Sequence, residues 1–362
     1  MKGILLILLA AVFFVSCNKE IPHDTNSLST PQINEKKVMT TALESNIPND
    51  PEKIKTYERT IVTPVLETKI LQDKNVIYSC TFQLVWNEFS KGDSLNSESE
   101  LVKLLNKKMV TKAILSEKDY LTAIVNNANE LKLLNESLKT KFGDNAPDEV
   151  IENTADGILF YSYMSKFLKF QKEFNEIIGG IYFGKNKVKT FGLQGYSVEK
   201  HAGLEKQVKI YDFKGYGDFI IELISKSAKD EIILANMVPK ETLLDTIKAA
   251  EERRNNSKPE SLKHADNLHI PDINMDLKHN YTELEVGGIS KAYQWTKFAL
   301  NKSGAEAKSE ARIVYKDGGH ERAFVFNKPF LIYLKEKGQE YPYLAIWVNN
   351  TEIMTPITNI SK

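Results

Sequence analysis

The clearest chemical pattern in this chain lies near the C-terminus, where small and charged side chains alternate after Gly304. Charged residues take positions 306, 308, 310 and 312, and the positions between them are small: Ala305, Ala307, Ser309 and Ala311. Because strand side chains alternate between two faces, this segment can form a strand with one face of small residues. Such a face fits between two strands without overpacking but gains little from burial. We therefore expect a segment that enters a sheet late or stays outside it as a loop.

The residues that follow have the composition of an exposed loop. Residues 312–322 are polar and contain the pair Gly318 and Gly319 together with the basic residues Lys316 and Arg322. A glycine pair between periodic segments is typical of a loop, and exposed loops are preferred sites of proteolysis. Two apolar runs at 324–334 and 341–348 come next, separated by a turn signal at 336–338, and they predict a C-terminal hairpin.

A second chemical site is the thiol of Cys17. It follows Ser16 and an apolar run at 4–15 that is too short to span a bilayer, with Lys2 in front of it. A small residue before such a cysteine is typical of bacterial lipoproteins, so we expect a signal peptide at 1–16 and a fatty acyl chain such as palmitate on Cys17. An ordinary secretory signal with an incidental Cys17, or a short anchor, is the alternative.

The lipoprotein interpretation sets the domain organisation. Residues 17–50 form a polar tether with three prolines, and residues 51–362 form one domain. Position 18 is Asn and no Asp follows the cysteine, which favours the bacterial outer membrane, at its periplasmic face or the cell surface. The lipid would be the only contact with the membrane.

Composition and motifs exclude several classes of function. The 48 basic and 48 acidic residues give a formal net charge of zero, so no field favours nucleic acid. No phosphate-binding glycine loop, nucleophile elbow or zinc-protease motif occurs, so we expect neither an enzyme nor a cofactor. Besides Cys17 the only cysteine is Cys80, which we expect in the core, without a disulfide.

One segment imitates a calcium loop. Residues 272–283 place oxygen-bearing side chains at the usual ligand positions, but Leu277 stands where such a loop needs glycine. A strand with polar outward residues is therefore expected there. Three histidines at 264, 269 and 279 lack the spacing of a zinc site, and we expect no metal centre.

Apolar spacing outlines the elements that position these residues. It predicts a helix at 52–71, a helix-rich region at 97–141 and a helix at 240–253. Strands are expected from residue 158 onward, at 191–196, 208–213, 219–224 and 232–237. Helices first and strands later, without a βαβ rhythm, indicate the α+β class.

The last quarter of the chain resembles the serpins. The resemblance rests on a strand at 291–304, the Gly304-led alternation, the loop, the run Phe326-Asn-Lys-Pro-Phe330 and a strand through Trp347. Residues 75–79, 158–167 and 268–274 look like three further serpin strands. The resemblance implies a helix-rich N-terminal half, large mixed or antiparallel sheets and a C-terminal reactive loop.

In functional terms, the resemblance implies a suicide inhibitor of serine-type endopeptidases that acts as a monomer. The hinge would be Gly304, Ala305, Ala307, Ser309 and Ala311, and the loop would include Lys316, Gly318, Gly319 and Arg322. The bond after Gly318 lies at the usual distance from the hinge glycine, and Lys316 or Arg322 would suit a trypsin-like protease.

Three departures from the serpin pattern keep a second function open. Lys302 stands where serpins usually carry an acidic residue, Ala305 where inhibitors favour Thr or Ser, and the outward hinge positions are charged. A non-inhibitory serpin-fold protein that binds another protein is therefore the alternative.

Overall fold

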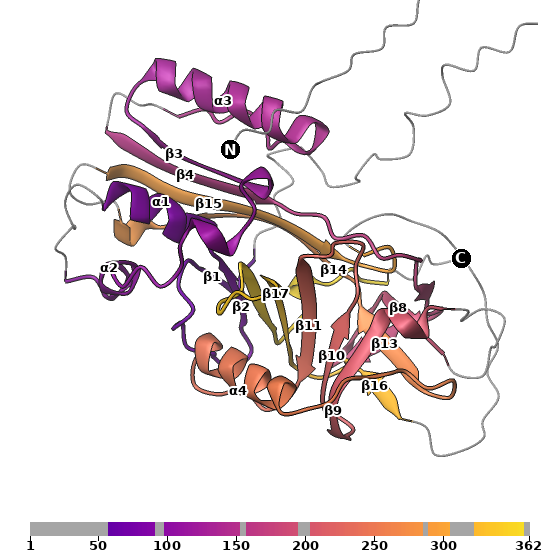
Figure 1. Ribbon diagram of the computed structural model, residues 1–362. Helices are drawn as coiled ribbons and strands as arrows, with labels where there is room; N and C mark the ends of the chain where they lie inside the picture. The colour runs from indigo at the N-terminus through magenta and orange to yellow at the C-terminus, as the bar shows by residue number, and fades with distance from the viewer. Residues whose placement is uncertain are drawn as a thin grey trace, which may run out of the picture. The chain divides into compact units, whose positions relative to one another are not determined.

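The structure is a computed structural model that describes residues 57–90, 98–152, 157–194, 203–284, 289–304 and 322–357 (Figure 1). All of them belong to one compact unit, Ser45–Lys362. Strands form three sheets of four or more members within this part of the chain, and short helices pack on them. The expected α+β class is confirmed.

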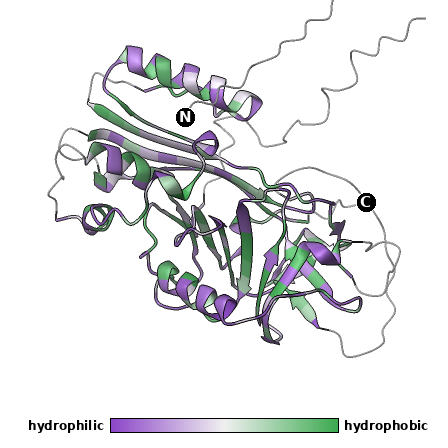
Figure 2. Ribbon diagram, viewed as in Figure 1, coloured by the Kyte–Doolittle hydropathy of each residue, from purple (hydrophilic) through white to green (hydrophobic). Residues whose placement is uncertain are grey.

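The largest sheet has eight strands in the order β1-β2-β18-β17-β11-β10-β9-β12. Their bounds are β1 Thr60–Thr63, β2 Asn75–Ser79, β9 Val208–Gly215, β10 Asp218–Leu223, β11 Asp230–Asn236, β12 Glu260–Ser261, β17 Phe330–Glu336 and β18 Leu344–Val348. The expected C-terminal hairpin is present, because β17 and β18 pair antiparallel with Phe330 opposite Val348. Both of its strands are almost wholly buried, so the hairpin belongs to the core. Figure 2 colours each described residue of the chain by its hydropathy.

A second sheet carries the segment that leads to Gly304. Its order is β14-β15-β4-β3, with β3 at Tyr120–Val125, β4 at Ile158–Ser165, β14 at Ile273–Asn280 and β15 at Ile289–Leu300. Helix α1, Thr81–Phe89, packs on one face, and helix α3, Ala128–Phe142, packs on the other (Figure 1). Both faces of this sheet are therefore covered.

The remaining elements are shorter. A third sheet has the order β16-β13-β8-β5, with β16 at Ala323–Val325, β13 at Asn267–Pro271, β8 at Thr190–Leu193 and β5 at Asn175–Glu176. Strands β6 and β7, Ile181–Phe183 and Asn186–Val188, form a hairpin. The other helices are α2 Glu100–Leu105 and α4 Leu243–Asn255, with 3-10 turns at Lys112–Ile114, Glu117–Asp119, Gly143–Asn145, Glu205–Gln207, Thr282–Leu284 and Thr351–Ile353.

Two expectations about the N-terminal half were wrong. Thr60–Thr63, within the helix expected at 52–71, is strand β1, because its run of β-branched residues suits a sheet and Pro64 cannot continue a helix. Strand β3 lies inside the region expected to be helical, since the spacing of its Leu121 and Ile124 imitates a helix. The expected strand at the calcium-like segment is confirmed, because β14 covers Ile273–Asn280.

Other expectations are confirmed. The helix expected at 240–253 is α4, whose N-terminus is capped by Thr242 Oγ1 accepting from the Asp245 backbone N–H at 3.1 Å. Cys80 is fully buried, and this burial raises the pKa of its thiol. Among the described residues no helix is both long and apolar enough to cross a membrane.

Candidate functional site

The candidate site is the boundary between β4 and β15, which we call the seam. These strands are parallel and directly paired, from Ile289 opposite Ile158 to Lys297 opposite Ser165. The other two pairings of this sheet, β14 with β15 and β3 with β4, are antiparallel. A strand running the opposite way could lie between β4 and β15 and pair antiparallel with both. The seam is therefore the only boundary between two described strands of this sheet where an inserted strand could pair antiparallel with both neighbours.

Side chains along the seam differ between its two faces. On the α1 face a buried polar group lies under the seam, where Tyr281 Oη donates to Gln294 Oε1 at 2.8 Å. Gln294 Nε2 donates to the Ser79 carbonyl at 3.3 Å, and Thr81 Oγ1 donates to Ser162 Oγ at 3.4 Å. These hydrogen bonds hold β4 and β15 to the start of α1.

The α3 face of the seam is aromatic. Tyr161 and Tyr293 meet edge to face at 5.5 Å between ring centroids, and Tyr163 and Trp295 do so at 6.5 Å. Helix α3 packs the buried Leu134 and Leu138 against this face, and its partly buried Phe142 meets Tyr163 edge to face at 4.9 Å between ring centroids. Helix α3 therefore covers this face through apolar and aromatic contacts.

Gly304 forms a turn just past the end of β15. Its N–H donates to the Asn301 carbonyl at 3.0 Å, and the Asn301 N–H donates back to the Gly304 carbonyl at 2.8 Å. Its φ of +104° is a conformation that side chains rarely adopt, and a Cβ atom here would lie 2.2 Å from the Leu168 carbonyl oxygen. Gly304 also bridges Lys169, just beyond the end of β4. The chain thus turns next to the end of the seam at which Lys297 lies opposite Ser165. We call this the open end of the seam.

A buried ion cluster ties β4 to the large sheet at the same end. Lys166, directly after β4, places its Nζ 2.7 Å from Asp230, 2.9 Å from Asp119 and 3.5 Å from Glu336. Its side chain is only 7% exposed. Burial lowers the pKa of the Lys166 ammonium, but hydrogen bonds to Asp230 and Asp119 outweigh this effect and raise its pKa overall. We call these four residues the Lys166 cluster.

Hydrogen bonds complete the Lys166 cluster. The Tyr343 hydroxyl donates to Asp230 at 3.0 Å, and the Ser116 hydroxyl and N–H donate to Glu336 at 2.6 and 2.8 Å. Burial opposes ionisation of Glu336, yet these bonds from Ser116 and the charge of Lys166 lower its pKa. Any movement of β4 away from β15 must strain or break these contacts.

Arg322 is the first described residue after Gly304 along the chain, and its side chain has several partners. Its guanidinium binds Glu260 and lies 2.6 Å from Asp266 Oδ2, and it packs over the rings of Phe213 and Phe324 at 5.8 and 5.5 Å. A protease specificity pocket would have to extract the side chain from these partners. These contacts hold the Arg322 side chain in place, and its expected role in a reactive loop stays a prediction.

Two titratable groups with shifted pKa values lie in and just after β13, His269 within the strand and Asp272 before β14. Burial raises the pKa of Asp272 to about 6, and the charge of Glu176 adds to this effect. Lys302, the basic residue two positions before Gly304, places its Nζ 3.8 Å from the carboxylate of Glu176 in β5. Burial lowers the pKa of His269 to about 4. Neither shift was signalled by the sequence, because both come from tertiary burial.

The remaining predicted site residues lie outside the described residues. These are Cys17, Ala305, Ala307, Ser309, Ala311, Lys316, Gly318 and Gly319. The structure does place Gly304 and Arg322, the two ends of the segment that carries all of these but Cys17. Sequence reasoning missed the Lys166 cluster, because its four members are far apart in the chain and carry no motif.

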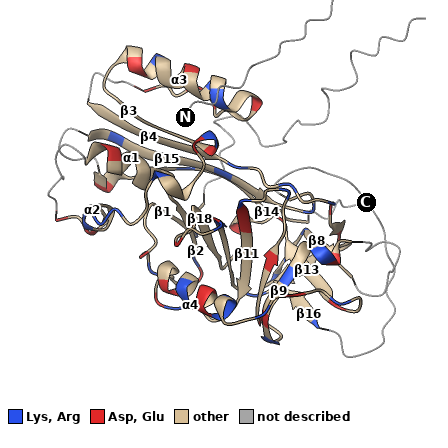
Figure 3. Ribbon diagram, in the orientation of Figure 1, with Lys and Arg blue, Asp and Glu red and all other residues tan. Residues whose placement is uncertain are grey.

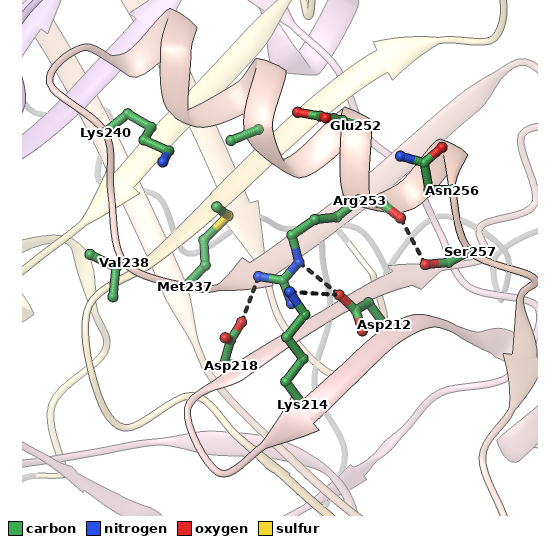
Figure 4. Close-up of a pocket in the computed structure, with 11 residues that line it drawn as sticks. Asp212, Lys214, Asp218, Met237, Val238, Lys240, Glu252, Arg253, Asn256 and Ser257 are labelled. Carbon is green, nitrogen blue, oxygen red and sulfur yellow. Dashed lines mark hydrogen bonds and ion pairs between the residues drawn. The ribbon is translucent and has the colours of Figure 1, made fainter.

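A surface pocket of about 510 Å³ lies beside α4 and is lined by charged side chains (Figure 4). There the Arg253 guanidinium binds Asp212 at 2.7 Å and Asp218 at 2.5 Å. The lining cations Lys214, Lys240 and Arg253 are matched by an equal number of carboxylates. The pocket contains none of the predicted site residues, and its charges neutralise one another.

Comparisons with known proteins add solved structures of similar fold. No protein-family model matches the chain, and a search of curated protein sequences finds no significant match. The chain is similar to Serpin48 of the insect Tenebrio molitor, with 12% identity and a TM-score of 0.45 over 76% of this chain and 92% of that one. It is also similar to a tumour-suppressing serpin, with 13% identity and a TM-score of 0.49 over 76% and 92%. Human thyroxine-binding globulin with its hormone matches at 9% identity and a TM-score of 0.47 over 78% and 92%.

Proposed function

We propose that the chain is a serpin-like inhibitor of serine-type endopeptidases that presents residues 313–323 as bait, with residues 304–311 as the hinge. The observation that carries this proposal is the parallel seam with a glycine turn beside its open end. The alternating segment after Gly304 spans eight residues, the length of β4. Reversed at Gly304, it would run antiparallel to both β4 and β15.

The proposed reaction starts as ordinary proteolysis. The protease serine attacks the carbonyl carbon of Gly318, the bond to the Gly319 nitrogen breaks, and the Gly318 carbonyl forms an ester with the serine oxygen. The Gly319 nitrogen leaves as a new amino terminus. Arg322 keeps the downstream end in place, so only the upstream part is free to move. Lys316 is the second candidate for the cut, by a trypsin-like protease.

Insertion would then trap the protease. Residues 305–312 would enter the seam, replacing one parallel ladder by two antiparallel ladders for a gain of several kcal/mol. The small side chains of Ala305, Ala307, Ser309 and Ala311 would lie on the α1 face, over the buried polar group. The acylated protease, carried along on the loop, would be distorted before its ester is hydrolysed.

The alternative, a non-inhibitory binding protein, is favoured by the other face of the seam. The charged residues at 306, 308, 310 and 312 would lie among Tyr161, Tyr163 and Tyr293 unless α3 moves away. Burying unpaired charges against aromatic rings costs several kcal/mol. In this case the loop would bind a partner without inserting.

Gel electrophoresis after mixing with a panel of serine proteases decides between the two. An inhibitor gives a covalent complex that survives SDS, whereas a binding protein is only nicked. Insertion is tested by comparing the melting temperatures of nicked and intact protein. Ala307→Arg, on the inward face, should abolish the stabilisation of the nicked form, and Lys308→Ala, on the outward face, is the matched control. Equal melting temperatures for nicked and intact wild-type protein would refute insertion.

We also propose that Cys17 anchors the protein to the bacterial outer membrane. The support is the short apolar run that ends in Ser16-Cys17. A tether of more than 30 residues then separates the lipid from the first described strand. Placed this way, the loop would meet proteases at the periplasmic face or the cell surface.

A further inference from the structure

Strand β3 forms an open edge of the seam-bearing sheet. It pairs with β4 along all six residues, Tyr120 to Val125, and no described strand pairs with its other side. The side chains from Leu121 to Ile124 are half-buried, so the edge is reachable from solvent. A strand edge presents a row of backbone donors and acceptors that can pair with another strand.

This edge lacks the features that usually prevent strand addition. The sequence Tyr-Leu-Thr-Ala-Ile-Val has no charge, proline or glycine, and β3 is tan along its length in Figure 3. The opposite edge of the same sheet differs, because β14 carries Asp276 and Lys278. Charged residues on edge strands discourage pairing with other chains. One edge is therefore protected and the other is not.

The charged residues at the two ends of β3 favour a second copy of this strand as the partner of its open edge. Before the strand stand the exposed Glu117 and Lys118, and after it α3 begins at Ala128. Glu130 in the first turn of α3 accepts hydrogen bonds from Asn126 and Asn127. In a two-fold antiparallel pairing the start of one β3 meets the end of the other. Glu117 would then lie near a helix N-terminus, which favours negative charge, and Lys118 near Glu130.

We propose that two copies of this chain associate through their β3 edges to form a continuous eight-stranded sheet. The two-fold axis passes beside Thr122 and Ala123, at the centre of the strand. The chain's own tether is a poor occupant, because residues 17–50 are polar and contain three prolines, which cannot donate to a ladder. The proposed dimer would take the place of the monomer expected from the sequence.

Cysteine cross-linking in the full chain tests the dimer. A two-fold axis places a residue opposite its own copy, so Thr122→Cys or Ala123→Cys should give a disulfide-linked product of twice the chain mass under mild oxidation. Asn274→Cys, exposed on the protected edge, is the matched control, and the unchanged chain measures the background from Cys17 and the buried Cys80. We expect about tenfold more dimer from the better β3 variant than from the control.

A second variant keeps the proposal testable without oxidation. Thr122→Lys restores a charge to the edge and should reduce the sedimenting mass of the full chain in detergent from two copies to one, with an unchanged melting temperature. The proposal is overturned if neither β3 cysteine exceeds the control. It is also overturned if the product contains a different protein, or if the unchanged chain sediments as one copy. None of these outcomes depends on protease inhibition.

Discussion

Replacing Lys166 by Met should destabilise the protein strongly, because it removes the only cation among three carboxylates in the Lys166 cluster. After the change Asp230 keeps the Tyr343 hydroxyl and Glu336 keeps the two donors of Ser116. The Asp119 Oδ2 atom, 2.9 Å from Lys166 Nζ, has no other partner among the described residues and would be left unpaired. Removing one partner of a buried ion pair costs ~3–5 kcal/mol. We expect a loss of about 3 kcal/mol in the free energy of unfolding, since two of the three carboxylates stay hydrogen-bonded.

The assay is urea denaturation at pH 7, with a second substitution as an internal check. Asp119→Asn should destabilise the wild type but stabilise the Lys166→Met variant, because it then removes an unpaired charge. Lys69→Met is the matched control: the Lys69–Glu241 pair is 3.0 Å long, but both side chains are at least 70% exposed, so its loss should cost less than about 1 kcal/mol. A loss below about 1 kcal/mol in Lys166→Met, or the same sign for Asp119→Asn in both backgrounds, would refute this reasoning.

The pH dependence of the same variant has a definite sign. The pKa of Glu336 is lowered in the folded protein, so its contribution to stability is present above its unfolded pKa and is lost as the pH falls through the folded value. The difference between wild type and Lys166→Met should therefore be largest near neutral pH and shrink below about pH 4.5. Because the cluster restrains β4 at the seam, the variant should also insert the cleaved hinge faster.

Three further predictions concern single residues. Gly304→Ala should cost ~2 kcal/mol or more in thermal unfolding, because its Cβ atom would meet the Leu168 carbonyl oxygen at a positive φ; a variant that melts with the wild type would contradict the turn geometry. The pKa of Asp272 is raised to about 6, so its ionisation lowers the free energy of unfolding as the pH rises through that value. Asp272→Asn should raise the free energy of unfolding by up to ~3 kcal/mol at pH 7 and leave it unchanged at pH 4. An increase that does not depend on pH would contradict this prediction. Cys17→Ala should abolish metabolic labelling with palmitate, and label that persists would remove the lipid anchor.

The sequence alone determined the strands of the C-terminal half. The hairpin of β17 and β18, the strands β9 to β11 and helix α4 were all expected, because their apolar runs are long and bounded by turn residues or a cap. The expectation for the N-terminal half was less accurate. In β1 and β3 a few apolar residues fit both a helical and a strand period, and only pairing with a neighbour decides between them.

The candidate site also has features that the sequence predicts and features that depend on tertiary contacts. Gly304 and the alternation after it follow from residue types at fixed spacing, and the structure explains why that position requires glycine. The role of Arg322 could not be read from the chain, because its partners Glu260 and Asp266 are more than 50 positions away. A basic residue in a polar run predicts exposure, whereas its stacking on two rings depends on tertiary contacts.

What only the tertiary structure decided is which strands meet and which charges share a low-dielectric site. The parallel pairing of β4 with β15 joins segments separated by more than 120 residues, and no local pattern encodes it. The Lys166 cluster likewise gathers residues from four distant segments, and the pKa shifts of Asp272 and His269 come from burial by several elements at once. Sequence periodicity fixes the face of each strand, but the neighbours of that face are set by the packing of the whole chain.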